Sequence, residues 1–116
     1  MENGMKLIDI DGLQRTALAF AEARGWRKFH NPKNLAMALS VEVAELVEIF
    51  QWKTPEESAA VMESGEREHV EQELADIAIY LSELVSVLGV DLDAAVRAKF
   101  ELNARKYPAA GGTSDV

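Results

Sequence analysis

The stretch 40-SVEVAELVEIFQW-52 is almost wholly apolar, yet three glutamates are set into it at three-residue spacing. If the stretch is a helix, apolar side chains surround the whole cylinder, and such a helix is usually buried. A buried carboxylate without a partner is strongly disfavoured and tends to take up a proton instead. Another part of the chain must therefore compensate Glu42, Glu45 and Glu48.

Caps and helix breakers divide the rest of the chain into helices, with almost no strand signal. Asn31 before Pro32 is a helix start, and Thr54 followed by Glu57 predicts a capping box. Gly89 is a stop signal. The predicted helices span about 9–24, 32–52, 55–63, 66–88 and 92–107.

Short connections between long amphipathic helices predict an all-α fold, an antiparallel four-helix bundle. The pattern indicates a single domain over residues 1–108. The remaining residues, 109–116, read AAGGTSDV and are expected to be a disordered tail.

Composition excludes several classes of partner and site. The 116 residues have a formal net charge of −8, which disfavours nucleic acid and anionic membranes as partners. The chain has no cysteine, so it forms neither disulfides nor thiolate metal sites. It has no apolar run of roughly 20 residues and no signal sequence at its start, so we expect a soluble, untargeted, cytoplasmic protein.

Carboxylates recur along one stripe of each long central helix. Steps of three and four residues place side chains on one face of a helix. The stripe on the second helix consists of Glu42, Glu45, Ile49 and Trp52. The stripe on the helix over 66–88 consists of His69, Glu73, Asp76, Tyr80 and Glu83. If the two helices face each other, four carboxylates converge.

Such a cluster predicts a metal site, because like charges at close range do not all stay ionised without cations. Oxygen ligands favour Mg²⁺, with Mn²⁺ as a second possibility. The metal ligands predicted in this way are Glu42, Glu45, Glu73 and Asp76. Solvated helix faces also carry glutamates at this spacing, and the role of Glu48, as a ligand or as a solvated group, stays open.

The last helix carries hydrogen-bond donors at the same spacing. Lys99, Asn103 and Lys106 share a stripe, with Tyr107 beside them. Ammonium and amide groups suit phosphate oxygens. The alternative is an exposed helix end whose cations interact with the helix dipole.

Several ordered motifs together carry a family resemblance. They are FAEARGW, FHNPKNLAMAL, EVAELVEIFQWK, ELADIAIYL, GVDL and KFELNARKYP, which cover roughly residues 20–108. This arrangement resembles the MazG-type all-α nucleoside triphosphate pyrophosphohydrolases, and within them the small dCTP pyrophosphatase branch. Two positions depart from the usual pattern: Val41 stands where an acid is frequent, and Lys106 where an arginine is frequent.

The resemblance implies Mg²⁺-dependent hydrolysis of a nucleoside triphosphate, with dCTP or a modified dCTP expected as substrate, to the monophosphate and pyrophosphate. It implies that Glu42 or Glu45, with Glu45 preferred, activates the attacking water, and that the stripe from Lys99 to Tyr107 holds the phosphates. It also implies a base pocket lined by aromatic and imidazole side chains, namely Trp26, His30, Trp52 and Tyr80. From the residues alone, both tryptophans could instead be core anchors and His30 a surface side chain.

The resemblance also implies a homodimer or homotetramer with sites shared between subunits. The apolar coverage of the two central helices agrees with this expectation, since one small chain cannot cover both. Two other classes remain as alternatives. A ferritin-like di-metal protein needs E-x-x-H pairs, whereas this helix reads Glu73-x-x-Asp76. A non-catalytic helical interaction module would use the acids in salt bridges between subunits.

Overall fold

The computed structural model describes residues 5–110, and this range is helical with no strand. Its elements are α1 (Asp11–Ala23), the 3-10 turn η1 (Arg27–Phe29), α2 (Pro32–Phe50), α3 (Pro55–Ala59), the 3-10 turn η2 (Val61–Glu63), α4 (Arg67–Leu88) and α5 (Leu92–Lys106). The predicted all-α class is confirmed. Of the tail expected at 109–116, residues 111–116 lie outside the described range.

The predicted caps form as the sequence indicates. The side chain of Asn31 accepts from the Asn34 backbone amide at 2.9 Å, and Pro32 is the first helical residue of α2. Thr54 and Glu57 make both bonds of a capping box, at 3.1 and 2.8 Å. These local bonds fix where the two helices begin.

Two segments differ from the sequence prediction. The helix expected over 55–63 ends at Ala59, and the η2 turn follows it as a separate element. The segment between the helices predicted at 9–24 and 32–52 contains the short turn η1. Gly25 and Gly89 adopt φ values of 67° and 69°, and this left-handed backbone ends α1 and α4; for Gly89 this is the predicted stop.

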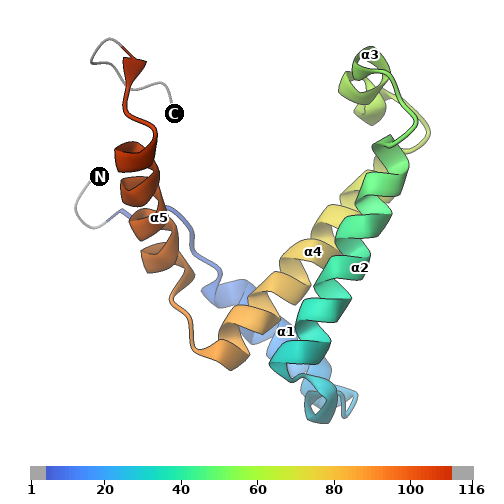
Figure 1. The fold of residues 1–116 in the computed structure, drawn as a ribbon. Coiled ribbons are helices and arrows are strands. Elements are labelled where there is room, and N and C mark those ends of the chain that lie inside the picture. Colours follow the sequence, from blue (N-terminus) through green and yellow to red (C-terminus); the bar gives the residue numbers. More distant parts are fainter. Residues whose placement is uncertain (1–4, 111–116) are drawn as a thin grey trace.

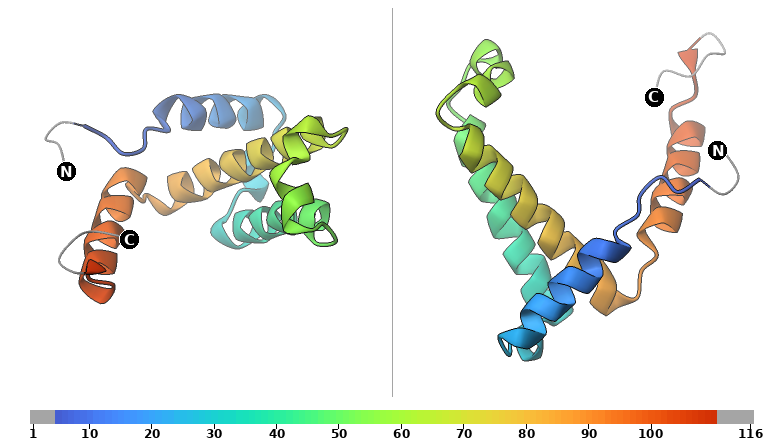
Figure 2. Two further views of the ribbon diagram at one scale, coloured as in Figure 1. Left: turned by 90° about the horizontal axis from the view of Figure 1, so that it is seen from above. Right: turned by 180° about the vertical axis from the view of Figure 1, so that it is seen from behind.

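Helix α4 lies between α1 and α2 (Figure 2). It runs antiparallel to α2, and the two helices form one arm of the molecule (Figure 1). Near the outer end of this arm, Ile49, Val61 and Val70 are buried together, with Leu46 and Phe50 packed against them. Burial of each such side chain contributes about 1.5–3 kcal/mol.

Small side chains bring α1 close to α4. Ala17 and Ala21 are buried on α1, and Ser82 is buried on α4. The Gln14 side-chain amide donates to the Ser82 carbonyl oxygen at 3.4 Å, which links the two helices.

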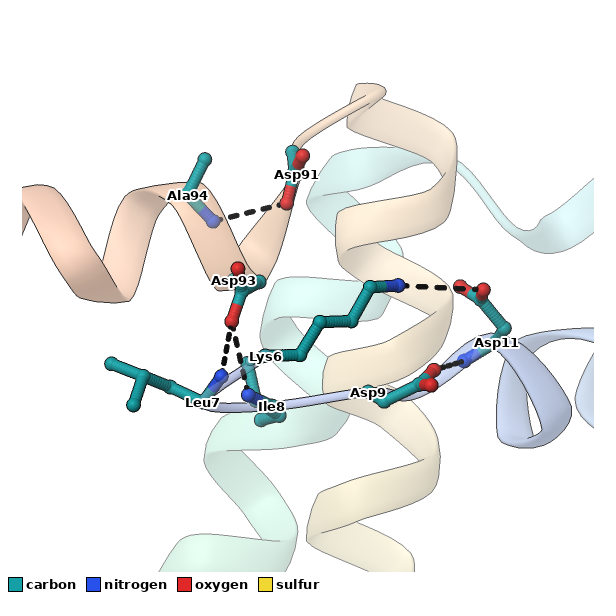
Figure 3. A network of polar contacts seen from close by, with 8 residues as sticks. All are labelled: Lys6, Leu7, Ile8, Asp9, Asp11, Asp91, Asp93 and Ala94. Carbon is teal, nitrogen blue, oxygen red and sulfur yellow. Dashed lines mark hydrogen bonds and ion pairs between the residues drawn. The ribbon is translucent and has the colours of Figure 1, made fainter. Parts of the chain in front are cut away.

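Helix α5 diverges from the other long helices and forms the second arm (Figures 1 and 2). Its first turn is tied to the N-terminal segment, because Asp93 Oδ1 accepts from the backbone amides of Leu7 at 2.6 Å and Ile8 at 3.1 Å (Figure 3). Asp93 Oδ2 also accepts from Arg97 at 2.9 Å. The Arg97 contact and the two amides lower the pKa of Asp93.

The antiparallel four-helix arrangement is therefore not seen within one copy. Among residues 5–110, seven apolar residues are buried and twenty large apolar residues are exposed. The radius of gyration is 17.6 Å, whereas a compact domain of this size has a value of roughly 13 Å. One copy thus leaves much apolar surface uncovered.

None of the described helices has both the length and the apolar character needed to cross a bilayer.

Candidate active site

Three of the predicted carboxylates meet between α2 and α4. Glu42 comes from α2, and Glu73 and Asp76 come from one turn of α4. One oxygen from each of the three lies within 4.8 Å of the others. Because α2 and α4 are antiparallel neighbours, the two acid stripes face each other as the sequence predicts.

The electrostatics of this cluster are those of crowded like charges. Contact with the Glu73 carboxyl, burial, and the charges of Glu45, Glu73 and Asp76 raise the pKa of Glu42 to about 7. Glu73 is buried; its Oε2 lies 3.2 Å from His69 Nε2, while its Oε1 has no hydrogen-bond donor. An unsatisfied buried carboxylate oxygen is costly, and a cation would compensate it.

Glu45 lies close enough to raise the pKa of Glu42, but it is not one of the three residues whose oxygens converge. It lines a separate open hollow together with Glu48, Ile49, Glu66 and His69. Glu48 is exposed. Glu45 therefore stands at the edge of the cluster, on the side of this hollow.

A largely apolar cavity of about 310 Å³ adjoins the cluster and shares Asp76 with it. It lies between α1, α4 and the two residues that flank η1. Its lining residues are Leu13, Thr16, Ala17, Phe20, Ala21, Trp26, His30, Asp76, Ile79, Tyr80 and Glu83. Three of the four side chains predicted for the base pocket, Trp26, His30 and Tyr80, are gathered here.

Aromatic rings form part of the cavity wall. The rings of Phe20 and Trp26 meet edge to face, with centroids 5.7 Å apart. Burial and the charges of Glu42, Glu83 and Asp76 raise the pKa of Tyr80. Trp26 is exposed, so it is a rim side chain and not a core anchor within one copy.

His30 and Glu83 form an ion-pair contact at the cavity wall. His30 Nδ1 lies 3.2 Å from Glu83 Oε2. Both side chains also line a small neighbouring cavity of about 60 Å³. The structure therefore makes His30 a cavity residue and not the surface side chain that the sequence left as an alternative.

The other predicted substrate-binding residues are not brought to this cavity within one copy. Trp52 lies just beyond α2 and is 88% exposed. The four residues predicted to bind the phosphates lie on or just after α5, and α5 diverges from the α2–α4 arm. These residues are Lys99, Asn103, Lys106 and Tyr107. None of these five residues lines the cavity.

Sequence reasoning missed the contribution of α1 and of Glu83. Leu13, Thr16 and Phe20 line the cavity, but an apolar helix stripe does not reveal whether it faces a core or a ligand. Glu83 was detectable, because it continues the stripe of Asp76 and Tyr80 by one further turn.

Comparison with known proteins gives a consistent result. Residues 37–114 match the MazG-like family. The chain is 44% identical to human dCTP pyrophosphatase 1 over 101 residues, which is 86% of this chain, and 44% identical to the bovine protein over 100 residues, or 85% of this chain. It spans 59% of the length of these curated relatives.

A solved structure shares the fold. The crystal structure of a pyrophosphatase from Archaeoglobus fulgidus superposes with a TM-score of 0.80 at 42% identity and covers 93% of this chain and 100% of its own. The matched family region contains both acid stripes that meet between α2 and α4. The chain belongs to the MazG-like family.

Proposed function

We propose that the protein is a Mg²⁺-dependent nucleoside triphosphate pyrophosphohydrolase that cleaves between the α and β phosphates. The observation that carries this proposal is the adjacency of two features. Three carboxylate oxygens lie within 4.8 Å of one another, and an apolar cavity large enough for a base shares Asp76 with them. A nucleotide has these two parts, a charged phosphate chain and an aromatic ring.

The residues of the cluster suit a hard divalent cation. Glu42, Glu73 and Asp76 offer only oxygen, and Glu73 Oε1 lacks a hydrogen-bond donor. When bound, Mg²⁺ supplies positive charge that stabilises the negative charge developing on a phosphate chain. Within residues 5–110, no histidine belongs to the group, which favours this chemistry over a di-metal oxidase.

Glu45 is the proposed base. It lies beside the three converging acids without joining them, so its carboxylate stays available to orient or deprotonate the attacking water. Glu42 is the second candidate for this role. Its raised pKa means that a proton must leave before it can act as ligand or base.

The proposed substrate is dCTP or a modified dCTP, in line with the name of the curated relatives. The base would enter the cavity, where Trp26 and Tyr80 offer aromatic surface. Apolar walls reject a small added group weakly, so a 5-substituted cytosine should also be accepted. Removal of such nucleotides would serve to clean the nucleotide pool in the cytoplasm.

We further propose that the active form is a homodimer or homotetramer in which a second copy completes the site and the four-helix packing. The exposed apolar surface supports an association of copies. The stripe of Lys99, Asn103 and Lys106 lies on α5, away from the acids of its own chain, and would bind the phosphates of the other copy's substrate. Neither nucleic acid nor a membrane is expected as a partner.

The test is pyrophosphate release from dCTP, 5-methyl-dCTP, dTTP, dATP and dGTP, with Mg²⁺ and with EDTA. We expect Mg²⁺-dependent release, with the highest kcat/KM for dCTP or 5-methyl-dCTP and lower values for the purines. Equal values or a purine preference would reject the proposed substrate. Release from none of the five would reject the enzyme class and favour the non-catalytic interaction module.

A further inference from the structure

The apolar cavity contains one histidine–glutamate pair that the proposed hydrolysis does not use. Glu83 projects from α4 one turn beyond Tyr80, and His30 follows η1 directly. Their side chains are 11% and 19% exposed, so the pair is largely withdrawn from solvent. A nearly buried carboxylate without a structural task elsewhere is a candidate ligand-binding group.

The pair leaves one carboxylate oxygen available. His30 Nδ1 contacts Glu83 Oε2 at 3.2 Å. Within residues 5–110, this is the only hydrogen bond or ion pair of the Glu83 carboxylate, so Oε1 has no partner. Burial raises the pKa of Glu83, and the charge of His30 opposes that rise. His30 thus helps to keep the carboxylate ionised in an apolar setting.

Local structure holds His30 in place. Its backbone amide donates to the Arg27 carbonyl oxygen at 3.0 Å. The Asn34 side chain donates to the Phe29 carbonyl oxygen at 2.9 Å, which ties the end of η1 to the first turn of α2. The imidazole is therefore presented to Glu83 from a fixed position.

The hydroxyl groups of the cavity do not distinguish a donor from an acceptor on the base. The hydroxyls of Thr16 and Tyr80 both donate and accept, so they suit an amino group or a carbonyl group equally. Asp76 belongs to the carboxylate cluster. The indole N–H of Trp26 only donates, but this side chain lies exposed at the rim. An ionised Glu83 only accepts, so it would strongly favour an amino group on the base.

We propose that Glu83 is a specificity-determining residue whose free oxygen accepts a hydrogen bond from the exocyclic amino group of a 4-aminopyrimidine, with His30 as its positioning residue. This inference rests on the proposed function for the identity of the substrate. A 4-oxopyrimidine would place a carbonyl oxygen against the carboxylate and leave both acceptors without a donor. Glutamate accepts from the cytosine amino group in the same way in DNA recognition.

The test compares dCTP with dUTP, because these substrates share the sugar, the phosphates and the unsubstituted 5-position. We expect the wild-type protein to prefer dCTP by roughly 10- to 100-fold in kcat/KM. Glu83→Gln, which can donate to a carbonyl group, should bring the ratio to within about threefold of unity. His30→Gln should also lower the ratio. Glu63→Gln, which changes an exposed side chain of the η2 turn, should leave the ratio unchanged.

A binding measurement separates this inference from the proposed hydrolysis. Calorimetric titration of dCMP and dUMP needs no turnover, and the wild-type preference for dCMP should disappear in Glu83→Gln. If the protein releases no pyrophosphate but shows this loss, the inference stands and the proposed function fails. If the wild type treats the two bases alike, or Glu83→Gln keeps the wild-type ratio, the inference is overturned. A wild-type ratio near unity would overturn the inference even if a variant does not fold.

Discussion

Glu42 on α2 and Glu73 on α4 meet across the helix pair, and this contact is the largest of the causes that raise the pKa of Glu42 to about 7. A protonated Glu42 donates to Glu73, whereas an ionised Glu42 repels it. The fold therefore holds together two groups that repel each other once the pH rises above about 7, unless a cation is present.

The first prediction concerns the stability of the metal-free protein. The folded pKa of Glu42 is above its ordinary value of 4.5, so the folded state binds more protons than the unfolded state between about pH 4.5 and 7. Stability should therefore fall as pH rises through this window. Melting temperatures in EDTA at pH 5 and pH 8 measure it, and Mg²⁺ should restore stability at pH 8.

Glu42→Gln is the matched control, because it removes the carboxyl group that takes up or releases a proton in this pH window. The variant should show a flatter dependence of melting temperature on pH. An equally steep fall in the variant would assign the effect to other groups. Asp93 does not interfere, because its lowered pKa places its titration below this range.

The second prediction concerns two acids of the site, the proposed ligand Asp76 and the proposed base Glu45. Asp76→Asn or Glu45→Gln should reduce activity by roughly a hundredfold or more. Neither should unfold the chain, since each removes charge from a repulsive cluster. Glu48→Gln, which changes an exposed neighbour on α2, should retain activity. Turnover at limiting Mg²⁺ and thermal melts measure both effects; near-normal turnover of Asp76→Asn would show that the metal assignment is wrong.

Local patterns in the sequence were sufficient to predict much of this structure. The caps at Asn31 and Thr54 depend on neighbouring residues only, and they form as predicted. The convergence of Glu42 with Glu73 and Asp76 followed from helix periodicity together with one assumption, that the two helices are antiparallel neighbours. Short connections make that arrangement the expected one.

Features that depend on the tertiary arrangement of the helices could not be predicted from the sequence in the same way. Periodicity does not give the direction of α5 relative to α4, because Gly89 ends one helix and no local rule fixes where the next one points. Phe20 could not be told from a core residue, since both a core and a cavity wall are apolar. The separation of Glu45 from the three converging acids depends on side-chain positions, which a stripe does not specify.

The third prediction concerns Trp52. Because its side chain is 88% exposed, Trp52→Ala should change the stability of one copy little, by about 0.5 kcal/mol or less. If the indole stacks on a base in a neighbouring copy's site, KM should rise by the equivalent of about 1 to 3 kcal/mol, with a smaller change in kcat.

Phe29→Ala is the control for Trp52, since Phe29 is also an exposed aromatic residue and lies outside the lining of the cavity. Its KM should stay at the wild-type value. Loss of folding in Trp52→Ala, or the same KM rise in both variants, would remove Trp52 from the site.

The fourth prediction tests whether two copies share a site. Glu73→Gln and Lys106→Ala should each be inactive or nearly so. In mixed dimers, one of the two sites would contain an intact acid cluster and an intact α5, so random mixing should restore about a quarter of wild-type activity. Mixing Glu73→Gln with Asp76→Asn is the control and should restore none. No recovery in the first mixture would indicate that each site is built within one copy.

The most direct measurement of the central proposal is the identity of the products formed from dCTP. Anion-exchange chromatography of a reaction with Mg²⁺ should show dCMP and pyrophosphate in equal amounts, and both should be absent with EDTA or with Glu73→Gln. Formation of dCDP and orthophosphate, or the same products at the same rate in EDTA, would contradict a metal-dependent cleavage between the α and β phosphates at the Glu42, Glu73 and Asp76 cluster.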